Sequence, residues 1–515
     1  MIILFTVSLD GQWRRNFGMK YSILDNGTVR LWHDHIGNLR PNGVGGSWNG
    51  KGILYDHGLH FIGKVRDTTK VIMDYWYSPY SPGPIIQKVP AIYFPGIDTS
   101  RFRPYNIFRK DDTDNQPDVD EWPADLGAPI DSLGRPRLFG DNMVWMIYNG
   151  LDTAARGFYP SRDPGRVGLP LEIRQTMYSY SEIPPGFPSF LKDVVFLEWQ
   201  IYNKGDVTID SLYYGFWTDI DFNNSSNPPG VDTISQVGYC WTPRDTDLPL
   251  TVGYVLLKGP VRPSPGASAT FGETLVEGAK NLPMTSFWGI YDDSYNDSSD
   301  HAPPYSVGTM WNVANGLHPR GHPMVDTTTG RVTRFSHPGD PVTGQGWIHP
   351  PSSGGGAGFI FFSGPVTMAP NDSQWMMIAM LPTLGSNRLE SINNLRLKAN
   401  LLREFSVSDL RGKGFDWKDS STVNPIIPVY HELHQNYPNP FNPKTTFTYD
   451  VGVEADIEIS VYTVLGQKIA TLVNERKPIG QYTVDFNANG LASGVYICRM
   501  KIDYMFLERK MVVLR

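Results

Sequence analysis

The sequence predicts an all-β protein: a large multi-strand β-sandwich region with one late helix, followed by a small C-terminal β-sandwich. Three observations predict this class: short segments in which apolar and polar residues alternate, an aromatic content of 13%, and 51 glycines and 42 prolines that separate the segments. Alternation with a period of two indicates strands with one buried face, aromatic residues favour pleated surfaces, and glycine and proline mark turns. At 515 residues, the chain is long enough for about two to four domains.

Two hairpins stand out in the first half of the chain. Asp25-Asn26-Gly27 joins residues 19–24 to 28–32, and Asn-Gly tolerates the positive φ of a two-residue turn. Lys204-Gly205 joins residues 193–203 to 206–217, which predicts a second hairpin. One face of its first strand is apolar, with Val195, Leu197, Trp199 and Ile201. Further strands are expected at residues 52–65, 70–77, 142–149, 171–181, 251–257, 359–363 and 373–381.

One helix is expected late in this region, at residues 387–405. Apolar residues recur there at roughly helical spacing: Leu389, Ile392, Leu395, Leu397, Leu401 and Leu402. The following residues lack periodicity and contain prolines, which marks a boundary. We therefore expect an all-β cargo region of one or two sandwiches at residues 13–410, a linker at 411–430 and a C-terminal domain at 431–515.

The C-terminal domain begins with a proline-rich segment, residues 436–443, which we call the strap. Its three prolines each fix φ near −65° and favour extended backbone in the residue before them. Tyr437 and Phe441 place large apolar side chains on the strap, which predicts an anchored entry strand. Alternating segments at residues 445–451, 455–465, 482–486, 494–500 and 508–515 then predict a small β-sandwich.

Six motifs of this domain occur in a fixed order: QNYPNPFNP (435–443), TTFTY (445–449), VYTVLG (461–466), GQY (480–482), LASGVY (491–496) and KMVVLR (510–515). Together they resemble the type A C-terminal sorting domain of the type IX secretion system, and the domain is similar to the Ig-like fold of flagellar hook-capping proteins. The resemblance implies export across the outer membrane of a Gram-negative bacterium, the type IX secretion machinery as partner, and frequent removal of the domain afterwards. The alternative is a stabilising Ig-like module without a sorting role. The sorting-signal residues that the resemblance implies are Asn436, Tyr437, Pro438, Asn439, Pro440, Phe441, Asn442, Pro443, Gly494, Tyr496 and Lys510.

Phrases in the cargo region resemble uncharacterised secreted proteins that carry the same sorting domain. They are LGAP (126–129), GDNMVW (140–145), WTDID (217–221), WNVANG (311–316) and GDPVTGQGW (339–347). This resemblance implies location and lineage but no activity.

The N-terminal residues are consistent with export. Residues 1–9 form an apolar run of the length of a signal-peptide core, without a basic segment before it, so residues 1–12 are interpreted as a truncated signal peptide. The alternative is a buried N-terminal strand. No other segment reaches membrane-spanning length.

Charge and cysteine content narrow the function classes. The net charge is −7 and no basic run occurs, which argues against nucleic acid and against an anionic membrane surface as partners. Cys240 and Cys498 fall in different expected domains, so both are expected to be small buried side chains instead of a disulfide.

Two acidic segments are candidate calcium sites, because carboxylate oxygens at alternating positions suit a hard cation. Neither is an EF-hand, since Pro117 and Asn224 stand where that loop requires glycine. The alternative for both is a solvated acidic or structural loop; for the second segment, an acid/base pair of Glu198 and Asp219 is a further alternative. The candidate ligands are Asp112, Asp114, Asp118 and Asp120 in the first segment and Asp219 and Asp221 in the second.

Other catalytic patterns are absent from the sequence. His33 with His35, and His318 with His322, have spacings that suit a metal, but no His-Glu-x-x-His motif occurs, and packing of loop histidines on aromatic residues is the preferred interpretation. No Gly-x-Ser-x-Gly elbow with matched partners and no phosphate-binding glycine loop is present. The sequence thus predicts no cofactor other than calcium.

These observations together favour a secreted or cell-surface protein whose cargo region is a binding or structural module. The first alternative is an extracellular hydrolase that acts on a polysaccharide, with carboxylates near Asp219 and Asp221. The second is an adhesion or envelope-layer subunit. An extracellular or surface polysaccharide is the expected class of further partner.

Overall fold

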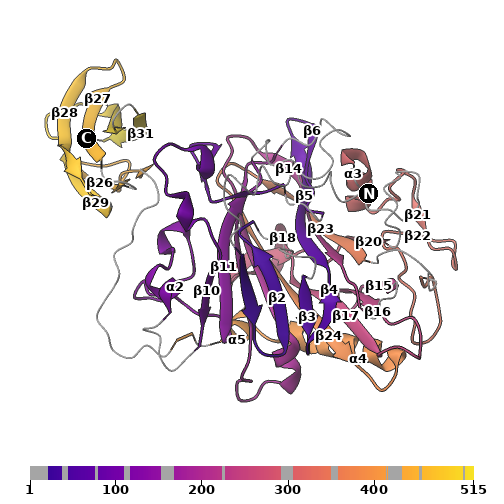
Figure 1. Ribbon diagram of the computed structural model, residues 1–515. Helices are drawn as coiled ribbons and strands as arrows, with labels where there is room; N and C mark the ends of the chain where they lie inside the picture. Colours follow the sequence, from indigo (N-terminus) through magenta and orange to yellow (C-terminus); the bar gives the residue numbers. More distant parts are fainter. Residues whose placement is uncertain are drawn as a thin grey trace, which may run out of the picture. The chain divides into compact units, whose positions relative to one another are not determined.

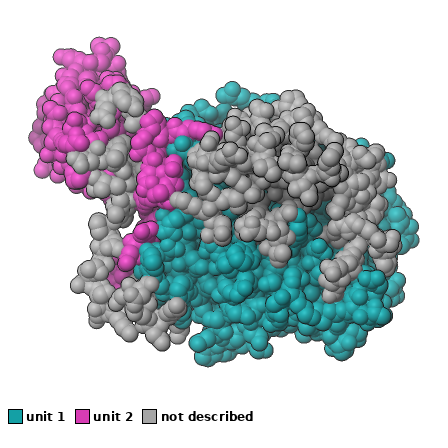
Figure 2. Space-filling model, viewed as in Figure 1, with its two compact units in different colours: residues 1–92, 102–119, 137–418 teal, residues 93–101, 120–136, 419–515 magenta. Residues whose placement is uncertain are grey.

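The computed structural model describes residues 21–36, 45–75, 79–109, 116–151, 168–222, 227–290, 306–349, 358–412, 414–415, 432–451, 455–478, 480–502 and 505–514. The all-β prediction is confirmed (Figure 1). The chain forms two compact units, one of residues 1–92, 102–119 and 137–418, the other of residues 93–101, 120–136 and 419–515 (Figure 2). The expected signal peptide at residues 1–12 lies outside the described residues.

The larger unit is built on two antiparallel sheets. The nine-stranded sheet has the order β10 (Tyr105–Phe108), β11 (Asn142–Asn149), β12 (Leu171–Ser179), β13 (Val195–Asn203), β24 (Ser373–Leu384), β17 (Leu250–Lys258), β16 (Val237–Trp241) and β15 (Pro229–Asp232), with β7 (Ser81–Pro82) paired to β11. The five-stranded sheet has the order β20 (Ser286–Ile290), β23 (Gly358–Met368), β14 (Ile209–Asp219), β5 (Asp56–Val65) and β6 (Thr68–Ile72).

The core of this unit lies between the two sheets. The apolar face predicted for β13 is confirmed, because Val195, Leu197, Trp199 and Ile201 are all buried in one hydrophobic cluster with residues of β14 and β5. The Trp199 and Phe216 rings, from the two sheets, have centroids 5.8 Å apart. Burial of each such side chain contributes about 1.5–3 kcal/mol, so the apolar alternation drives the packing of the two sheets.

The second predicted hairpin is wrong. β13 pairs with β12 and β24 in the nine-stranded sheet, whereas β14 pairs with β5 and β23 in the five-stranded sheet. The segment at Lys204-Gly205 therefore crosses from one sheet to the other instead of reversing the chain within one. β23 and β24 cross in the same way, so the two crossings lie together at one end of the unit.

Asn203 joins these two crossings. Its side chain is fully buried and its amide nitrogen donates hydrogen bonds to the carbonyls of Val207, Met368 and Ala369 at 2.9, 3.0 and 3.1 Å. Its side-chain oxygen accepts the N–H of Gly205 at 3.0 Å. One asparagine side chain thus provides hydrogen-bond partners for backbone groups at both places where the chain crosses between the sheets.

We expect Asn203→Ala to lower the free energy of unfolding of the larger unit by about 2–4 kcal/mol, because buried carbonyls lose their donors. Denaturant unfolding followed by tryptophan fluorescence measures this change. Asn394→Ala is the matched control, since Asn394 donates a single exposed bond to the Leu384 carbonyl. Equal effects of the two substitutions would contradict the role of Asn203.

The N-terminal hairpin is present, but its turn is longer than expected. β1 (Tyr21–Asp25) pairs with β2 (Val29–Asp34), and the register joins Asp25 to Arg30. The side chain of Asn26 accepts the N–H groups of Thr28 and Val29 and donates to the carbonyls of Tyr180 and Lys192. These bonds close a longer loop in place of the expected two-residue turn. β3 (Gly46–Trp48) and β4 (Lys51–Leu54) complete this four-stranded sheet.

The late helix is confirmed as α4 (Arg388–Glu404), with Asn387 as the N-cap and Phe405 as the C-cap. It packs on β17 and β24, where Gly253 leaves room for Leu395. Leu397, which the expected apolar stripe included, is 60% exposed. Several short helices were not expected from the sequence: α2 (Pro117–Asp120), α3 (Val307–Ala314), α5 (Val407–Arg411), η1 (Ala91–Tyr93), η2 (Thr99–Arg101), η4 (Ala124–Leu126) and η5 (Ser189–Asp193).

Three two-stranded ribbons complete the larger unit. They are β8 (Ile85–Ile86) with β9 (Val89–Pro90), β18 (Val261–Phe271) with β19 (Thr274–Asn281), and β21 (Met324–Val325) with β22 (Val332–Thr333).

The C-terminal residues form a small sandwich of two sheets. One sheet has the order β25 (Glu432–Leu433), β26 (Lys444–Val451) and β29 (Gly480–Asn487); the other has β28 (Lys468–Lys477), β27 (Ala455–Thr463), β30 (Gly494–Ile502) and β31 (Met505–Val513). The apolar positions of the expected alternation form the core, including Phe447, Ile457, Ile459 and Val461. β28 was not expected, because its apolar residues come in adjacent pairs, Ile469-Ala470 and Leu472-Val473, and do not alternate with polar residues.

Candidate functional site

The first half of the strap is joined to β26. Asn436 is 2% exposed, and its side chain donates hydrogen bonds to the Pro438 carbonyl at 3.0 Å and to the Thr445 hydroxyl at 2.9 Å. The backbone of Tyr437 both donates to and accepts from the backbone of Thr446, at 3.0 and 3.1 Å. The strap is thereby tied to the sheet at two successive residues.

The second half of the strap is joined to β31. Asn439 accepts the N–H of Val512 at 2.8 Å, and the N–H of Phe441 donates to the Val512 carbonyl at 3.0 Å. The Phe441 ring is 2% exposed and belongs to the core of the sandwich. The carbonyl of Lys510 accepts the side-chain amide of Asn439 at 3.3 Å.

The two aromatic residues of the strap differ. The prediction of an anchored segment is confirmed for Phe441 and is wrong for the Tyr437 side chain, which is 83% exposed. The expected extended backbone is also interrupted by bends at residues 438–440 and 442–443. The peptide bonds before Pro438, Pro440 and Pro443 are cis. Asn442 is exposed, and Pro438, Pro440 and Pro443 are exposed or half-buried.

The remaining residues that the resemblance implied lie on β30 and β31. Gly494 begins β30, where a Cβ atom would meet no neighbouring atom. Tyr496 is 9% exposed and its hydroxyl donates to the Ala492 carbonyl at 3.0 Å. Lys510 contributes its backbone carbonyl, which accepts from Gln435 at 2.8 Å and from Asn439. The six motifs thus meet in one sandwich that the strap closes.

Residues 435–514 match the family model described as a secretion system C-terminal sorting domain. They are a type IX secretion sorting domain. The match begins in the strap and ends in the last strand of the sandwich. The sorting domain indicates export to the cell surface or the extracellular space and an interaction with the secretion machinery. In the ranges that the structure describes, no helix combines the length and the apolar character needed to cross a membrane.

The cargo region has weaker similarities. No curated protein matches the chain. A solved polysaccharide lyase is similar at 10% identity and a TM-score of 0.18, over 66% of this chain and 34% of that one. PorZ, described as an essential surface component of the type IX secretion system of Porphyromonas gingivalis, is similar at 8% identity and a TM-score of 0.13, over 76% of this chain and 46% of that one. The chain thus spans less than half of either structure, and these TM-scores are too low to indicate a shared fold.

The first acidic segment is described only in part. Asp112 and Asp114 lie outside the described residues. Asp118 accepts the N–H of Asn106 at 2.7 Å and forms an ion pair with Arg103 at 2.6 Å. Asp120 ends the short helix α2. The carboxylate of Asp118 therefore has protein partners that compete with a cation.

The second acidic segment follows β14. Asp219 ends the strand opposite Asp56 of β5, and its carbonyl accepts the N–H of Tyr55 at 2.9 Å. Asp221 follows as an exposed residue. Over the described part of the chain, no group of three or more histidine, cysteine, aspartate or glutamate side chains is placed to hold a metal ion. Calcium at either segment stays a prediction, because both continue into residues that the structure does not describe.

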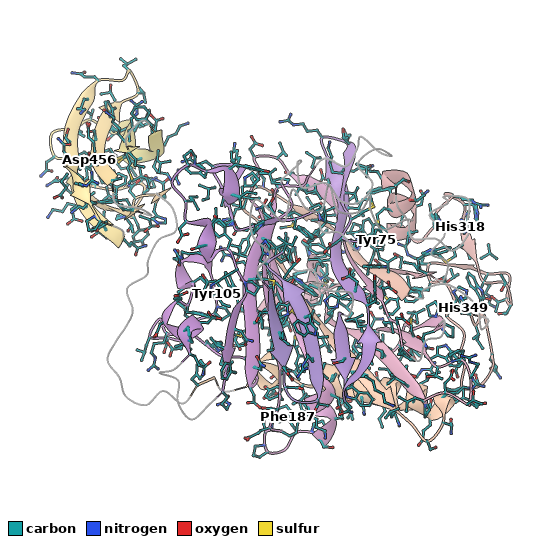
Figure 3. The ribbon with its side chains drawn as sticks, in the orientation of Figure 1. Tyr75, Tyr105, Phe187, His318, His349 and Asp456 are labelled. Carbon is teal, nitrogen blue, oxygen red and sulfur yellow. The ribbon has the colours of Figure 1, made fainter. Side chains whose placement is uncertain are left out.

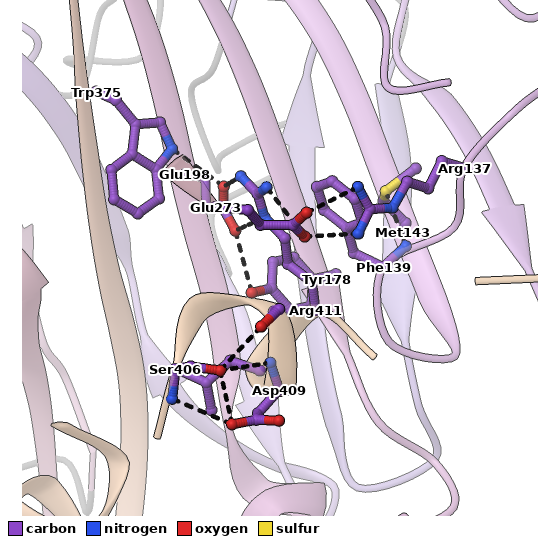
Figure 4. Close-up of polar contacts among 12 residues, drawn as sticks. Arg137, Phe139, Met143, Tyr178, Glu198, Glu273, Trp375, Ser406, Asp409 and Arg411 are labelled. Carbon is purple, nitrogen blue, oxygen red and sulfur yellow. Dashed lines mark hydrogen bonds and ion pairs between the residues drawn. The ribbon is translucent and has the colours of Figure 1, made fainter. Parts of the chain in front are cut away.

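Glu198 forms a buried polar network on the face of β13 opposite the core (Figure 4). Its carboxylate accepts hydrogen bonds from Tyr178 and Trp375, both at 3.1 Å, and from two nitrogens of Arg411, one of them at 3.0 Å. Arg411 also lies 3.5 Å from Glu273, which pairs with Arg137. Burial alone would lower the pKa of Arg411, but the charge and hydrogen bonds of Glu198 raise it above its usual value.

This network removes Glu198 from the acid/base hypothesis. Its two oxygens already accept hydrogen bonds from four protein donors, so this buried carboxylate is poorly placed to act on a substrate. Asp219 also lies on the other sheet. Arg411 was expected to lie in the linker and was not recognised from the sequence; the structure places this 7% exposed residue at the end of α5. The available signal was a glutamate within an apolar strand, which requires a buried partner.

The histidines form packing contacts. His33 and His35 are buried. The rings of His318 and His322 stack with centroids 4.2 Å apart, and His318 contacts Trp288 edge-on at 5.3 Å. His318 is labelled in Figure 3. The aromatic-rich segment Tyr213 to Trp217 is also buried. Packing was the preferred interpretation for the histidines.

Proposed function

We propose that this protein is a type IX secretion cargo whose large β-sandwich is a non-catalytic binding or structural module at the cell surface or outside the cell. The cargo region corresponds to residues 13–410 and extends through Arg411, and the sorting domain to residues 431–515. The observation that carries the non-catalytic part is the state of Glu198, a candidate catalytic carboxylate that is bonded to Arg411, Tyr178 and Trp375.

A polysaccharide is the first ligand class to test, because export places the module among surface and extracellular glycans. We expect native electrophoresis of the full-length protein, in gels cast with single bacterial or plant polysaccharides, to show retardation in at least one gel without a cleared zone after staining. The control is the same protein in a gel without polysaccharide, beside an acidic protein of similar size.

The other outcomes separate the alternatives. A cleared zone left by digestion would overturn the non-catalytic proposal and indicate a polysaccharide hydrolase. Free migration through every gel would remove the glycan partner and favour an adhesion or envelope-layer subunit.

A further inference from the structure

The strap contains two kinds of residue. Asn436 and Phe441 are each 2% exposed and form the hydrogen bonds and core contacts described above. Tyr437 stands between them with a side chain that is 83% exposed. Asn436 and Phe441 thus stabilise the sandwich, whereas the large aromatic side chain of Tyr437 stays in solvent.

Tyr437 differs from the other described tyrosines of the sorting domain. Tyr449 and Tyr496 are 1% and 9% exposed, and the hydroxyl of Tyr482 donates to the Pro478 carbonyl at 2.9 Å. Tyr462 is half-buried, with the Arg499 guanidinium 4.9 Å from the centre of its ring. The described residues offer no hydrogen bond to the Tyr437 hydroxyl, so its polar end faces water. Keeping a large ring in water forgoes the stabilisation that burial would give.

The backbone of Tyr437 is nevertheless held firmly. Both its N–H and its carbonyl bond to Thr446, and the Asn436 side chain fixes the preceding residue. A side chain that leaves from an ordered backbone loses less conformational entropy when a partner binds. Tyrosine is also among the residues that contribute most to binding energy at interfaces.

The residues beside Tyr437 on the sheet indicate the chemistry of the partner surface that would bind it. Tyr437 bridges to Thr446, and Thr446 pairs across the sheet with the exposed Asp485, to which its hydroxyl donates at 2.7 Å. Directly paired residues of antiparallel strands share one face of the sheet. An aromatic ring and a carboxylate are therefore presented together, which fits an apolar pocket with a basic group beside it.

We infer that Tyr437, with Asp485 beside it, is the side chain through which the sorting domain contacts the type IX secretion machinery, and that Asn436 and Phe441 hold it in place. This inference rests on the sorting role of residues 435–514. It assigns different roles to neighbouring residues that the resemblance treats as a single signal.

The test is export of the full-length chain in a bacterium with a working type IX system. We expect Tyr437→Ala to reduce the exported share, surface plus medium over total, by about tenfold or more, and Tyr437→Phe to keep most of it, because the ring supplies the contact area. Phe506→Ala is the matched control and should be exported normally, since Phe506 is an aromatic residue outside the six motifs that is 55% exposed on the same sandwich. Normal export of Tyr437→Ala would overturn the inference.

A second pair of variants tests the same surface without altering the strap. Asp485→Asn should lower export about threefold through the lost charge contact. Asp456→Asn, on the other sheet of the sandwich (Figure 3), should leave it unchanged. Equal export of the two variants would contradict a contact at Asp485. A chain without residues 435–515 shows whether sorting itself fails: normal export of that deletion would overturn the sorting role, whereas its retention beside normal export of Tyr437→Ala would overturn only the inference about Tyr437.

Discussion

Arg411→Ala will lower the free energy of unfolding of the larger unit by about 3–5 kcal/mol, because it leaves Glu198 buried and charged without its cation. Glu198 is 3% exposed, and the two remaining donors, Tyr178 and Trp375, are neutral. Neutral donors cannot replace the charge of the guanidinium in a site with little water. Denaturant unfolding followed by tryptophan fluorescence measures the change, and Trp375 reports from the network itself.

Two comparisons test whether the loss comes from an uncompensated charge. The double variant Glu198→Leu with Arg411→Leu removes both charges and should recover most of the lost stability. Arg30→Ala breaks an exposed pair with Asp25, in which the arginine side chain is 53% exposed, and should cost about 1 kcal/mol or less. A value for Arg411→Ala as small as that for Arg30→Ala would show that the buried network contributes little.

Acid will destabilise the larger unit well before most carboxylates are protonated. Burial lowers the pKa of His33 and of His60 from 6.5 to about 3, with the backbone near each ring offsetting part of the effect. Burial, and then the nearby His33, lowers the pKa of His57 in the same direction. The His57 ring lies between the sheets, with Nδ1 2.8 Å from the Tyr254 hydroxyl.

The direction of the pH effect follows from proton binding. Between pH 6.5 and 3 the unfolded chain binds protons at these histidines and the folded chain does not, so stability is complete above pH 6.5 and falls as the pH is lowered. Each histidine costs roughly 2 kcal/mol by pH 5. Glutamine cannot titrate, so the free energy of unfolding of the His60→Gln variant should fall by about 2 kcal/mol less than that of the wild type between pH 7.5 and pH 5. Parallel stability curves for the two proteins would contradict this assignment.

Local sequence patterns were sufficient to predict some elements of this structure. The alternation in residues 195–201 predicted a strand with one apolar face, and the spacing of leucines predicted α4, because each depends on the geometry of a single element. The order of motifs from the strap to Lys510 identified the sorting domain for the same reason, since each motif is a short stretch of chain.

The sheet topology and the surroundings of the candidate site residues depend on contacts between residues that are far apart in the sequence. Turn residues at Lys204-Gly205 are compatible with a hairpin or with a crossing, and the outcome depends on the pairing of β13 with β24 and of β14 with β23. Glu198 and Arg411 are 213 residues apart, so no local pattern shows that the glutamate is neutralised. Tyr437 and Phe441 look alike on the strap, and only the tertiary structure places the Phe441 ring in the core, 6.1 Å from the Phe486 ring, and leaves the Tyr437 ring in water. Periodicity states which face of an element is apolar, whereas the partner of that face is chosen by the free energy of the whole fold.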